Sequence, residues 1–125
     1  MAADVRYTKE HEWILVDGNT VAIGVTEYAQ NALGDLVYVE LPAVGDRFEK
    51  GDDFAVIESV KTAAEVYTPV AGEVYEVNGE LQDNADKIKS GLSGGWIAKL
   101  KVSDIAALDE LMDQAAYQEY VSGLE

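Results

Sequence analysis

The sequence has no cysteine and only one histidine among its 125 residues. The absence of cysteine excludes a disulfide framework and any thiolate metal site, and a single histidine supplies too few ligands for a zinc cage. We therefore expect no metal site. Any redox chemistry of this protein must come from a group attached to it, because no side chain of its own can cycle between thiol and disulfide.

Positive charge is also scarce. Nine Lys and Arg residues face 24 Asp and Glu residues, which gives a formal net charge of −15 at pH 7. Such a chain repels nucleic-acid phosphates and anionic lipid headgroups, and it favours partners with basic docking surfaces. We therefore expect neither nucleic acid nor a membrane among its partners.

Long apolar runs are missing as well. Nowhere do about 18 apolar residues follow one another, and the first ten residues, MAADVRYTKE, contain no apolar core of signal-peptide length. We expect a cytoplasmic chain of bacterial or archaeal type, although a processed mitochondrial matrix protein would look similar. The length of 125 residues favours a single domain over two.

What the sequence does contain is a series of short segments rich in Val, Ile, Tyr and Phe. Residues 21–25 alternate in the period of a half-buried strand, and Gly18 and Asn19 supply a turn back to residues 12–16. Further segments of this kind, separated by Gly, Pro and Asp, lie at 36–41, 54–60, 65–70, 72–77 and 96–102. The pattern predicts a mainly β fold, a sandwich or a barrel.

A short helix is predicted within this series of strands. Thr26 is a suitable N-cap, the apolar spacing over residues 27–33 is helical, and Gly34 ends the run. We expect two turns at most.

The end of the chain changes to helical periodicity. From Ser103 or Asp104 as a cap, one apolar face is formed by Leu108, Leu111, Met112 and Ala115. This predicts a C-terminal helical segment at about 104–121, packed on a core at about 15–102. Residues 78–95 form a long polar connection that we expect to run over the surface.

One lysine stands in an unusual place. In "ESVKTAAE", residues 58–65, Lys61 lies between β-branched neighbours, at the tip of the hairpin that the strands on either side would form. A lysine at a hairpin tip is exposed, has a flexible stem and can be acylated. From this motif alone, an ordinary solvated lysine remains the simpler interpretation.

The wider sequence changes that interpretation. In order, the blocks "EHEW", "IGVTEYAQNALGDLVYVELPAVGD", "ESVKTAAEVYTPVAGEV" and "GGWI" resemble the H-protein family of the glycine cleavage system, from residue 7 to the region of Tyr117. The resemblance implies a flattened barrel or sandwich of two antiparallel sheets, a lipoyl/biotinyl-domain-like hybrid, over residues 1–125 as one lipoyl-binding carrier domain. Biotin carriers differ, because their lysine is flanked by methionines whereas here the neighbours are Val60 and Thr62.

The resemblance also implies a cofactor and a set of partners. Lys61 would carry lipoate covalently, as N6-lipoyllysine, attached by a lipoate-attaching enzyme. The lipoyl arm would receive an aminomethyl group from glycine decarboxylase, a pyridoxal-phosphate enzyme, and pass its methylene to tetrahydrofolate on an aminomethyltransferase. Dihydrolipoamide dehydrogenase would re-oxidise the arm. The chain itself would be a non-catalytic carrier of glycine catabolism and, we expect, a monomer.

Three acidic residues match positions to which the family assigns roles. Glu12 and Glu65 match the acids that shelter the loaded amine, and Glu58 matches an acid that the lipoate-attaching enzyme recognises. Ordinary surface acids are the alternative for each, in a chain with 24 acids. His11 has no second histidine and no nucleophile pattern around it, so we expect a hydrogen-bonded structural histidine.

The sequence departs from the family pattern in one loop and near the arm. Within residues 85–92 the expected prolines and asparagine are replaced, with Ala85, Lys89, Gly91 and Leu92 in that stretch. Ala64 stands where Ser is frequent, and Tyr28 where His is common. A lipoyl depot that donates lipoyl groups to 2-oxoacid dehydrogenases therefore stays open as an alternative function, as does an unmodified interaction domain.

Overall fold

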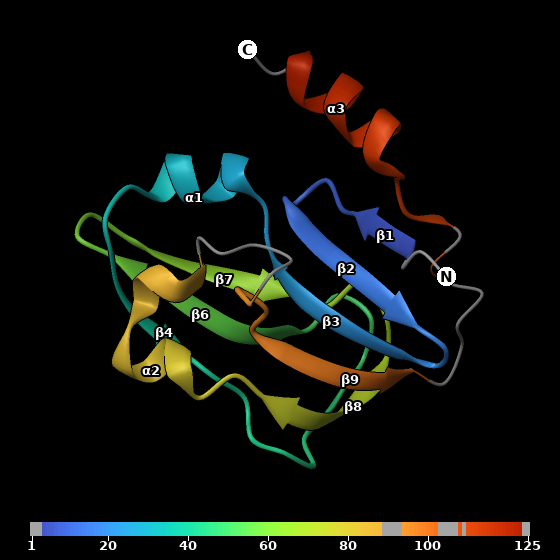
Figure 1. Cartoon of the computed structure of the whole chain (residues 1–125), viewed down its shortest axis with the longest axis horizontal. Helices are drawn as coiled ribbons and strands as arrows, with labels where there is room; N and C mark the ends of the chain where they lie inside the picture. The colour runs from blue at the N-terminus through green and yellow to red at the C-terminus, as the bar shows by residue number, and fades with distance from the viewer. Residues whose placement is uncertain (1–3, 89–93, 103–107, 109, 124–125) are drawn as a thin grey trace.

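The computed structural model describes residues 4–88, 94–102, 108 and 110–123, and their strands form two antiparallel sheets (Figure 1). In spatial order the larger sheet consists of β1 (Asp4–Tyr7), β2 (Glu12–Asp17), β3 (Thr20–Val25), β9 (Ala98–Val102), β8 (Gly72–Val77) and β5 (Arg47–Phe48). The smaller sheet consists of β4 (Leu36–Glu40), β6 (Asp53–Ser59) and β7 (Ala63–Tyr67). The mainly β prediction is confirmed, in the form of two sheets and not of one closed barrel.

The core draws on both sheets. Ile14, Ile23 and Leu100 of the larger sheet are fully buried in one cluster with Val39 and Ile57 of the smaller sheet. Burying each such side chain contributes roughly 1.5–3 kcal/mol relative to leaving it exposed. The half-buried strand predicted at residues 21–25 is wrong in one respect, because β3 is buried on both faces: all five residues are buried, including the small ones that alternate with the large apolar side chains.

The β2–β3 hairpin turns where the sequence predicts it. Gly18 has a φ of +61°, a conformation that costs glycine little, and the register pairs Asp17 with Thr20. Two strands were not predicted, β1 and the two-residue β5. Both lie at edges of the larger sheet, where short strands with few apolar residues give little periodic signal.

Helix α1 (Glu27–Leu33) confirms the short helix and its caps. The side chain of Thr26 accepts a hydrogen bond from the backbone N–H of Ala29, and Gly34 follows the last turn with a φ of +81°. The side-chain amide of Gln30, which is 8% exposed, donates to the carbonyls of Val25 and Ile88 at 3.1 and 3.2 Å. These bonds fasten α1 to the chain on both sides of it.

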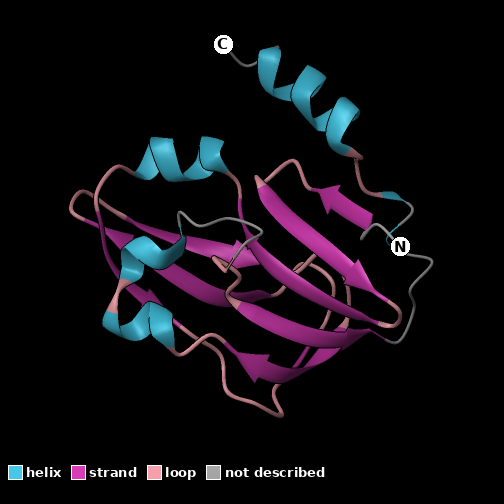
Figure 2. Cartoon of the chain, in the orientation of Figure 1, coloured by secondary structure: helices cyan, strands magenta, loops and turns pink. Residues whose placement is uncertain are grey.

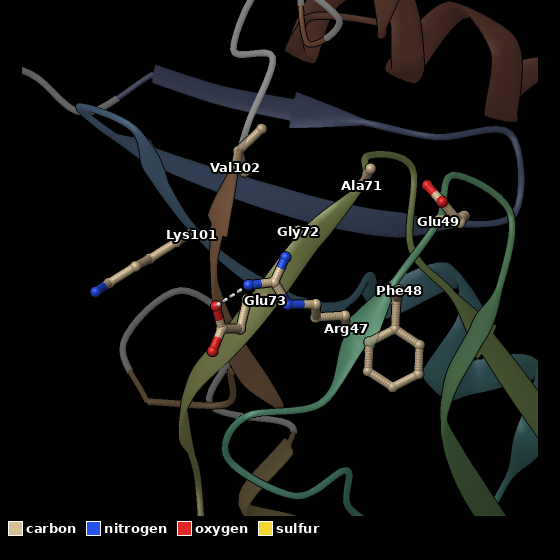
Figure 3. Close-up of a pocket in the computed structure, with 8 residues that line it drawn as sticks. All are labelled: Arg47, Phe48, Glu49, Ala71, Gly72, Glu73, Lys101 and Val102. Carbon is tan, nitrogen blue, oxygen red and sulfur yellow. Dashed lines mark ion pairs between the residues drawn. The ribbon is translucent and has the colours of Figure 1, made fainter.

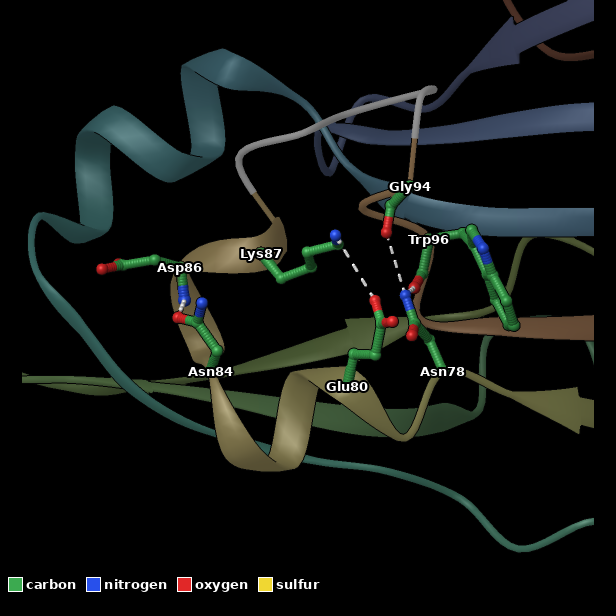
Figure 4. A network of polar contacts seen from close by, with 7 residues as sticks. All are labelled: Asn78, Glu80, Asn84, Asp86, Lys87, Gly94 and Trp96. Atoms are coloured by element: carbon green, nitrogen blue, oxygen red, sulfur yellow. Dashed lines mark hydrogen bonds and ion pairs between the residues drawn. The ribbon is translucent and has the colours of Figure 1, made fainter.

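The polar connection between β8 and β9 is more ordered than the sequence predicts. Its described part contains α2 (Glu80–Asp83) and a 3-10 turn over 85–88, in which Leu81 and Ile88 are fully buried. Figure 4 shows Asn78 donating to the carbonyls of Gly94 and Trp96, both at 2.9 Å, and so holding the two ends of the connection together. The connection does run over the surface, since most of residues 79–87 are exposed, but in this part it is helical and not an irregular loop; Lys89, Gly91 and Leu92 lie outside the described residues.

The C-terminal helix begins later than predicted. Helix α3 spans Gln114–Ser122 and is capped by Asp113, whose side chain accepts from the N–H of Ala116 at 2.9 Å. Met112, placed by prediction on the helical face, instead exchanges backbone hydrogen bonds of 2.8 and 3.0 Å with Tyr7 of β1. The helical segment is confirmed, but its start moves to 114; residues 103–107 lie outside the described part of the chain. Figure 2 shows α1 and α3 as separate helices next to the strand-rich body.

Candidate functional site

Lys61 lies in the turn between β6 and β7, as the sequence predicts. The last paired residues are Glu58 and Ala63, and Ser59 closes the turn. Its backbone N–H donates to the carbonyl of Thr62 at 2.7 Å, and its hydroxyl oxygen accepts from the N–H groups of Lys61 and Thr62 at 3.4 and 3.2 Å. The Lys61 side chain is thus exposed, while the backbone of the turn that carries it is held by hydrogen bonds within the turn.

The hairpin tip also rests on the end of α1. The N–H of Val60 donates to the carbonyl of Asp35 at 3.0 Å, and a Cβ built on Gly34 would lie 3.9 Å from Cε of Lys61. The stem of Lys61 therefore runs beside the C-terminal end of α1. A longer group attached to its Nζ would start from this point.

A pocket of about 190 Å³ opens between α1 and β7, and we call it the α1 pocket. Its polar lining consists of Glu10, His11, Glu12, Tyr28 and Glu65, and the remaining wall is made by alanine, valine, leucine and isoleucine side chains. The structure thus brings Glu12 and Glu65 together at one pocket. The half-buried Glu58 does not line it and lies on β6, opposite Tyr38 of β4 and Ala63 of β7.

Glu12 is buried, not a surface acid, with 2% of its area exposed. Its carboxyl oxygens accept from the backbone N–H of Tyr67 at 2.7 Å and from the hydroxyl of Thr8 at 3.1 Å. Burial raises the pKa of Glu12 to about 7, although both hydrogen bonds oppose the rise by favouring the charged form. Near neutral pH this carboxyl group is poised between its two states.

Glu65 differs from Glu12 in its surroundings. It is exposed on β7, where its backbone pairs with Val56 of β6, and it lines the same pocket from the solvent side. The pocket therefore combines one buried and one exposed acid.

His11 forms the wall of the pocket next to α1. It has a left-handed backbone with φ of +69°, and its ring lies 4.3 Å from that of Tyr28, centroid to centroid. Its Nδ1 is 2.9 Å from the hydroxyl of Tyr117 in α3. The predicted structural role agrees with this hydrogen bond. Tyr117 was not predicted as a neighbour, because it is 106 residues away in the chain.

A larger hollow, of about 420 Å³, lies against β5, β8 and β9 and contains the Arg47–Glu73 ion pair at 3.4 Å (Figure 3). None of its lining residues belongs to the lysine hairpin or to α1. Among the described residues no cluster of three or more His, Asp or Glu could hold a metal ion, and no helix is long and apolar enough to cross a bilayer. The lysine hairpin borders two hollows: the α1 pocket, through Ile57 and residues 64–66, and a pocket of about 290 Å³, through Tyr67.

Fold and hairpin together define the class of this protein. Two packed antiparallel sheets that present an exposed lysine on the turn between neighbouring strands of one sheet are a lipoyl/biotinyl-domain-like fold.

Comparisons with known proteins identify the family within that class. The family model described as "Glycine cleavage H-protein" matches residues 5–123. The chain is 49% identical to the glycine cleavage system H protein of Parvibaculum lavamentivorans over 124 residues, covering 98% of this chain and 99% of the relative. It is 55% identical to that of Thermus thermophilus over 114 residues, covering 90% and 89%.

A solved structure agrees with the sequence matches. The crystal structure of a glycine cleavage system H protein from Mycobacterium marinum superimposes with a TM-score of 0.85 at 32% identity, covering 98% of this chain and 99% of that one. The chain therefore belongs to the glycine cleavage H-protein family, whose members are lipoate-carrying components of glycine cleavage.

Proposed function

We propose that this chain carries lipoate on Lys61 and shuttles the aminomethyl group of glycine cleavage, without catalysing a step itself. The single observation that carries the proposal is the position of Lys61, exposed on a hydrogen-bonded turn beside the acid-lined α1 pocket. A tethered group stays at high local concentration near each docked enzyme and does not diffuse away between them.

The length of a lipoyl-lysine arm supports the use of the α1 pocket. About twelve bonds separate the lysine Cα from the nearer sulfur, as many as in the backbone of four residues, so the extended arm spans about 13 Å. Glu65 is four residues from Lys61 along the strand that leads to the pocket. An arm laid beside α1, where the lysine stem already points, would reach the polar lining.

The charges of the pocket suit the group that the arm would hold. An aminomethyl group is a primary amine and is positive near neutral pH. Glu12 and Glu65, with Glu10 beside them, offer carboxylates to this cation, and the apolar wall excludes water. Water is the reagent to exclude, because R–S–CH2–NH3⁺ and H2O give R–SH, formaldehyde and NH4⁺.

The partners in this proposal are the enzymes of the glycine cleavage system. They are glycine decarboxylase, the tetrahydrofolate-dependent aminomethyltransferase and dihydrolipoamide dehydrogenase, with a lipoate-attaching enzyme that recognises Glu58 near the tip. The net charge of −15 favours docking on basic surfaces of these partners. We further propose that the chain works as a monomer in the cytoplasm.

Intact mass tests the proposal directly. The chain and a Lys61→Arg variant are co-expressed with a lipoate-attaching enzyme and lipoate, and each is weighed and fragmented. We expect one lipoyl increment, located on Lys61, in the wild-type chain and none in the variant, which keeps the charge but offers no acylable amine. An unmodified wild-type chain, or an increment on another lysine, would overturn the proposal.

A further inference from the structure

The hydroxyl group of Tyr117 occupies a junction between three parts of the fold. It comes from α3, yet it lies 2.9 Å from Nδ1 of His11 in the β1–β2 turn and 2.7 Å from Oγ1 of Thr26, the N-cap of α1. Figure 1 shows that turn between the two helices. Tyr117 is 4% exposed, and its ring stacks on Tyr7 at 4.7 Å, so the hydroxyl is held in place by its ring.

The hydroxyls of Thr26 and Tyr117 and Nδ1 of His11 can form a chain of hydrogen bonds in one direction that gives each hydroxyl proton an acceptor. Thr26 Oγ1 already accepts from the N–H of Ala29, so its own proton can go to the oxygen of Tyr117. The proton of Tyr117 then goes to Nδ1 of His11, and burial, which raises the pKa of the phenol, keeps that proton available. If the donation ran the other way, Oγ1 of Thr26 would accept hydrogen bonds from both Tyr117 and Ala29. The hydroxyl proton of Thr26, a residue that is 6% exposed, would then lack an acceptor among the described contacts.

This direction of donation fixes the state of His11. An imidazole that accepts at Nδ1 is neutral and carries its proton on Nε2. The groups that face the ring are the hydroxyl of Tyr117 and the rings of Tyr28, Tyr117 and Tyr120, together with the acids Glu10, Glu12 and Glu65 that line the same pocket. Burial lowers the pKa of His11 and so favours the neutral ring, whereas the negative charge of Glu10 opposes that shift; the hydrogen bond from Tyr117 acts in the same direction as burial.

We propose that Tyr117 is a positioning residue of the α1 pocket: from the C-terminal helix it holds His11 as the uncharged Nε2–H tautomer, which leaves the pocket acids free to hold a cationic group. An imidazolium at this position would pair with the same carboxylates and repel a positive ligand. The inference rests on the proposed function, in which that ligand is the aminomethyl group on the arm. It gives α3 a role in the chemistry of a pocket to which the helix contributes no lining residue.

The test uses Tyr117→Phe, which keeps the stacked ring and removes only the hydroxyl. Tyr120→Phe is the matched control, because Tyr120 lies on the same helix and near the same imidazole, but its hydroxyl donates to the carbonyl of Lys9 at 3.4 Å. His11 is the single histidine of the chain, so long-range 15N–1H spectra of untagged, unlipoylated protein report its tautomer and titration without overlap.

We expect the wild type and Tyr120→Phe to show the Nε2–H tautomer. Tyr117→Phe should show a mixture, and its ratio of imidazolium to imidazole at a given pH should rise about three- to tenfold, as for the loss of one neutral hydrogen bond. In lipoylated protein loaded with the aminomethyl group, Tyr117→Phe should release formaldehyde about two- to tenfold faster than the control.

The outcomes separate this inference from the proposed function. A tautomer in Tyr117→Phe equal to that of the wild type would overturn the inference whether or not the chain can be lipoylated. A changed tautomer with an unchanged release rate would overturn it as well, while lipoylation of Lys61 would still stand. Failure of lipoylation in all three proteins would count against the proposed function and leave the tautomer result to be judged by itself.

Discussion

The carboxyl group of Glu12 is placed where its charge depends on what the α1 pocket contains. Burial disfavours the carboxylate, and the donors Tyr67 and Thr8 favour it, with the pKa raised to about 7 as the net result. A cation brought into the pocket would favour the carboxylate further and lower this pKa. Binding of an amine and ionisation of Glu12 are therefore linked, and each should strengthen the other.

The linkage predicts how the loaded group is lost. Glu12→Gln and Glu65→Gln should both speed the release of formaldehyde from the aminomethyl-loaded protein, by about tenfold or more for the buried Glu12 and about twofold for the exposed Glu65. In the loaded wild type, release should accelerate as the pH falls below about 7, because the bound amine lowers the pKa of Glu12 from its value of about 7 in the unloaded chain. Timing formaldehyde release against pH in the three proteins checks both effects; equal rates in wild type and Glu12→Gln would remove Glu12 from the cradle.

Glu12 should also make the stability of the unmodified chain depend on pH. Its pKa is near 4.5 when unfolded and about 7 when folded, so the folded chain binds more protons between these values and loses stability as the pH rises. Glu12→Gln mimics the protonated form and keeps an acceptor for Tyr67. We expect the variant to gain, relative to wild type, up to about 3 kcal/mol in free energy of unfolding between about pH 4 and pH 7.5, measured by urea denaturation. A constant difference across this range would contradict the raised pKa.

Individual residues differed in how far the sequence predicted them. Lys61 was predictable, because strand pattern and turn position are local properties. The burial of Glu12 was not, since it depends on donors from Thr8 and from Tyr67, the latter 55 residues away. Tyr117 was not predicted at the site for the same reason: its partner His11 comes from the other end of the chain, and the sequence contains no local pattern that joins them.

At the scale of elements, one side chain adds three hydrogen bonds to the two backbone bonds that hold the lysine turn. Ser59 accepts from two backbone N–H groups of the turn and donates to the carbonyl of Thr62 at 3.1 Å. The turn that presents Lys61 is thus held by hydrogen bonds to Ser59 and to the carbonyl of Asp35, and not by burial of its side chains, since residues 60–62 are all exposed.

Ser59→Ala should loosen this turn while leaving the sheets in place. The lost hydrogen bonds should cost about 1 kcal/mol, and the amides of Lys61 and Thr62 should exchange with solvent several times faster. Thr62→Val is the control, because the hydroxyl of Thr62 makes only a 3.5 Å contact with the carbonyl of Ala63. Hydrogen exchange followed by NMR checks the prediction, and equal protection of these amides in Ser59→Ala and wild type would contradict it.

The C-terminal segment shows where element prediction fails. Leu108, Leu111 and Met112 have helical spacing, but such spacing only says that these residues can be buried on one side. Leu108 is indeed buried, with 3% of its area exposed. Met112, however, forms a β-bridge with Tyr7, and this extended pairing prevents a helix from running through residue 112. Helix α3 therefore begins only after its N-cap, Asp113. The bridge requires β1, which the sequence pattern does not predict. Without β1 the bridge cannot be foreseen either, and the start of the helix is predicted too early.

At the scale of the whole molecule, two sheets could be predicted but their division of strands could not. Many short strands with turns between them indicate a β sandwich or a barrel, and the resemblance to the H-protein family implies two sheets. The hairpins β2–β3 and β6–β7 follow from neighbouring segments. In the larger sheet, however, β3 pairs with β9, although these two strands lie more than 70 residues apart in the sequence. Such pairings are decided by the packing of the finished core, for which a single sequence offers no local signal.

Charge is the other property of the whole molecule. With 24 acids and nine cations, 24 − 9 = 15 negative charges are not neutralised by Lys or Arg, whatever the arrangement of ion pairs. Self-repulsion at this charge disfavours the compact state, and salt screens it over a distance that falls from about 30 Å at 0.01 M to about 10 Å at 0.1 M. We therefore predict that the melting temperature rises by several degrees when sodium chloride increases over this range.

A charge variant separates this general effect from local ion pairs. Glu40 and Glu119 are both exposed, and changing both to lysine brings the formal charge from −15 to −11 without touching the core or the α1 pocket. Because less repulsion remains to be screened, the E40K/E119K variant should melt higher than the wild type at low salt and gain less from added salt. Calorimetry of both proteins at matched pH decides the point. If the wild type melts lower in salt, or if both proteins respond equally, surface ion pairs such as Arg47–Glu73 outweigh the net charge in setting stability.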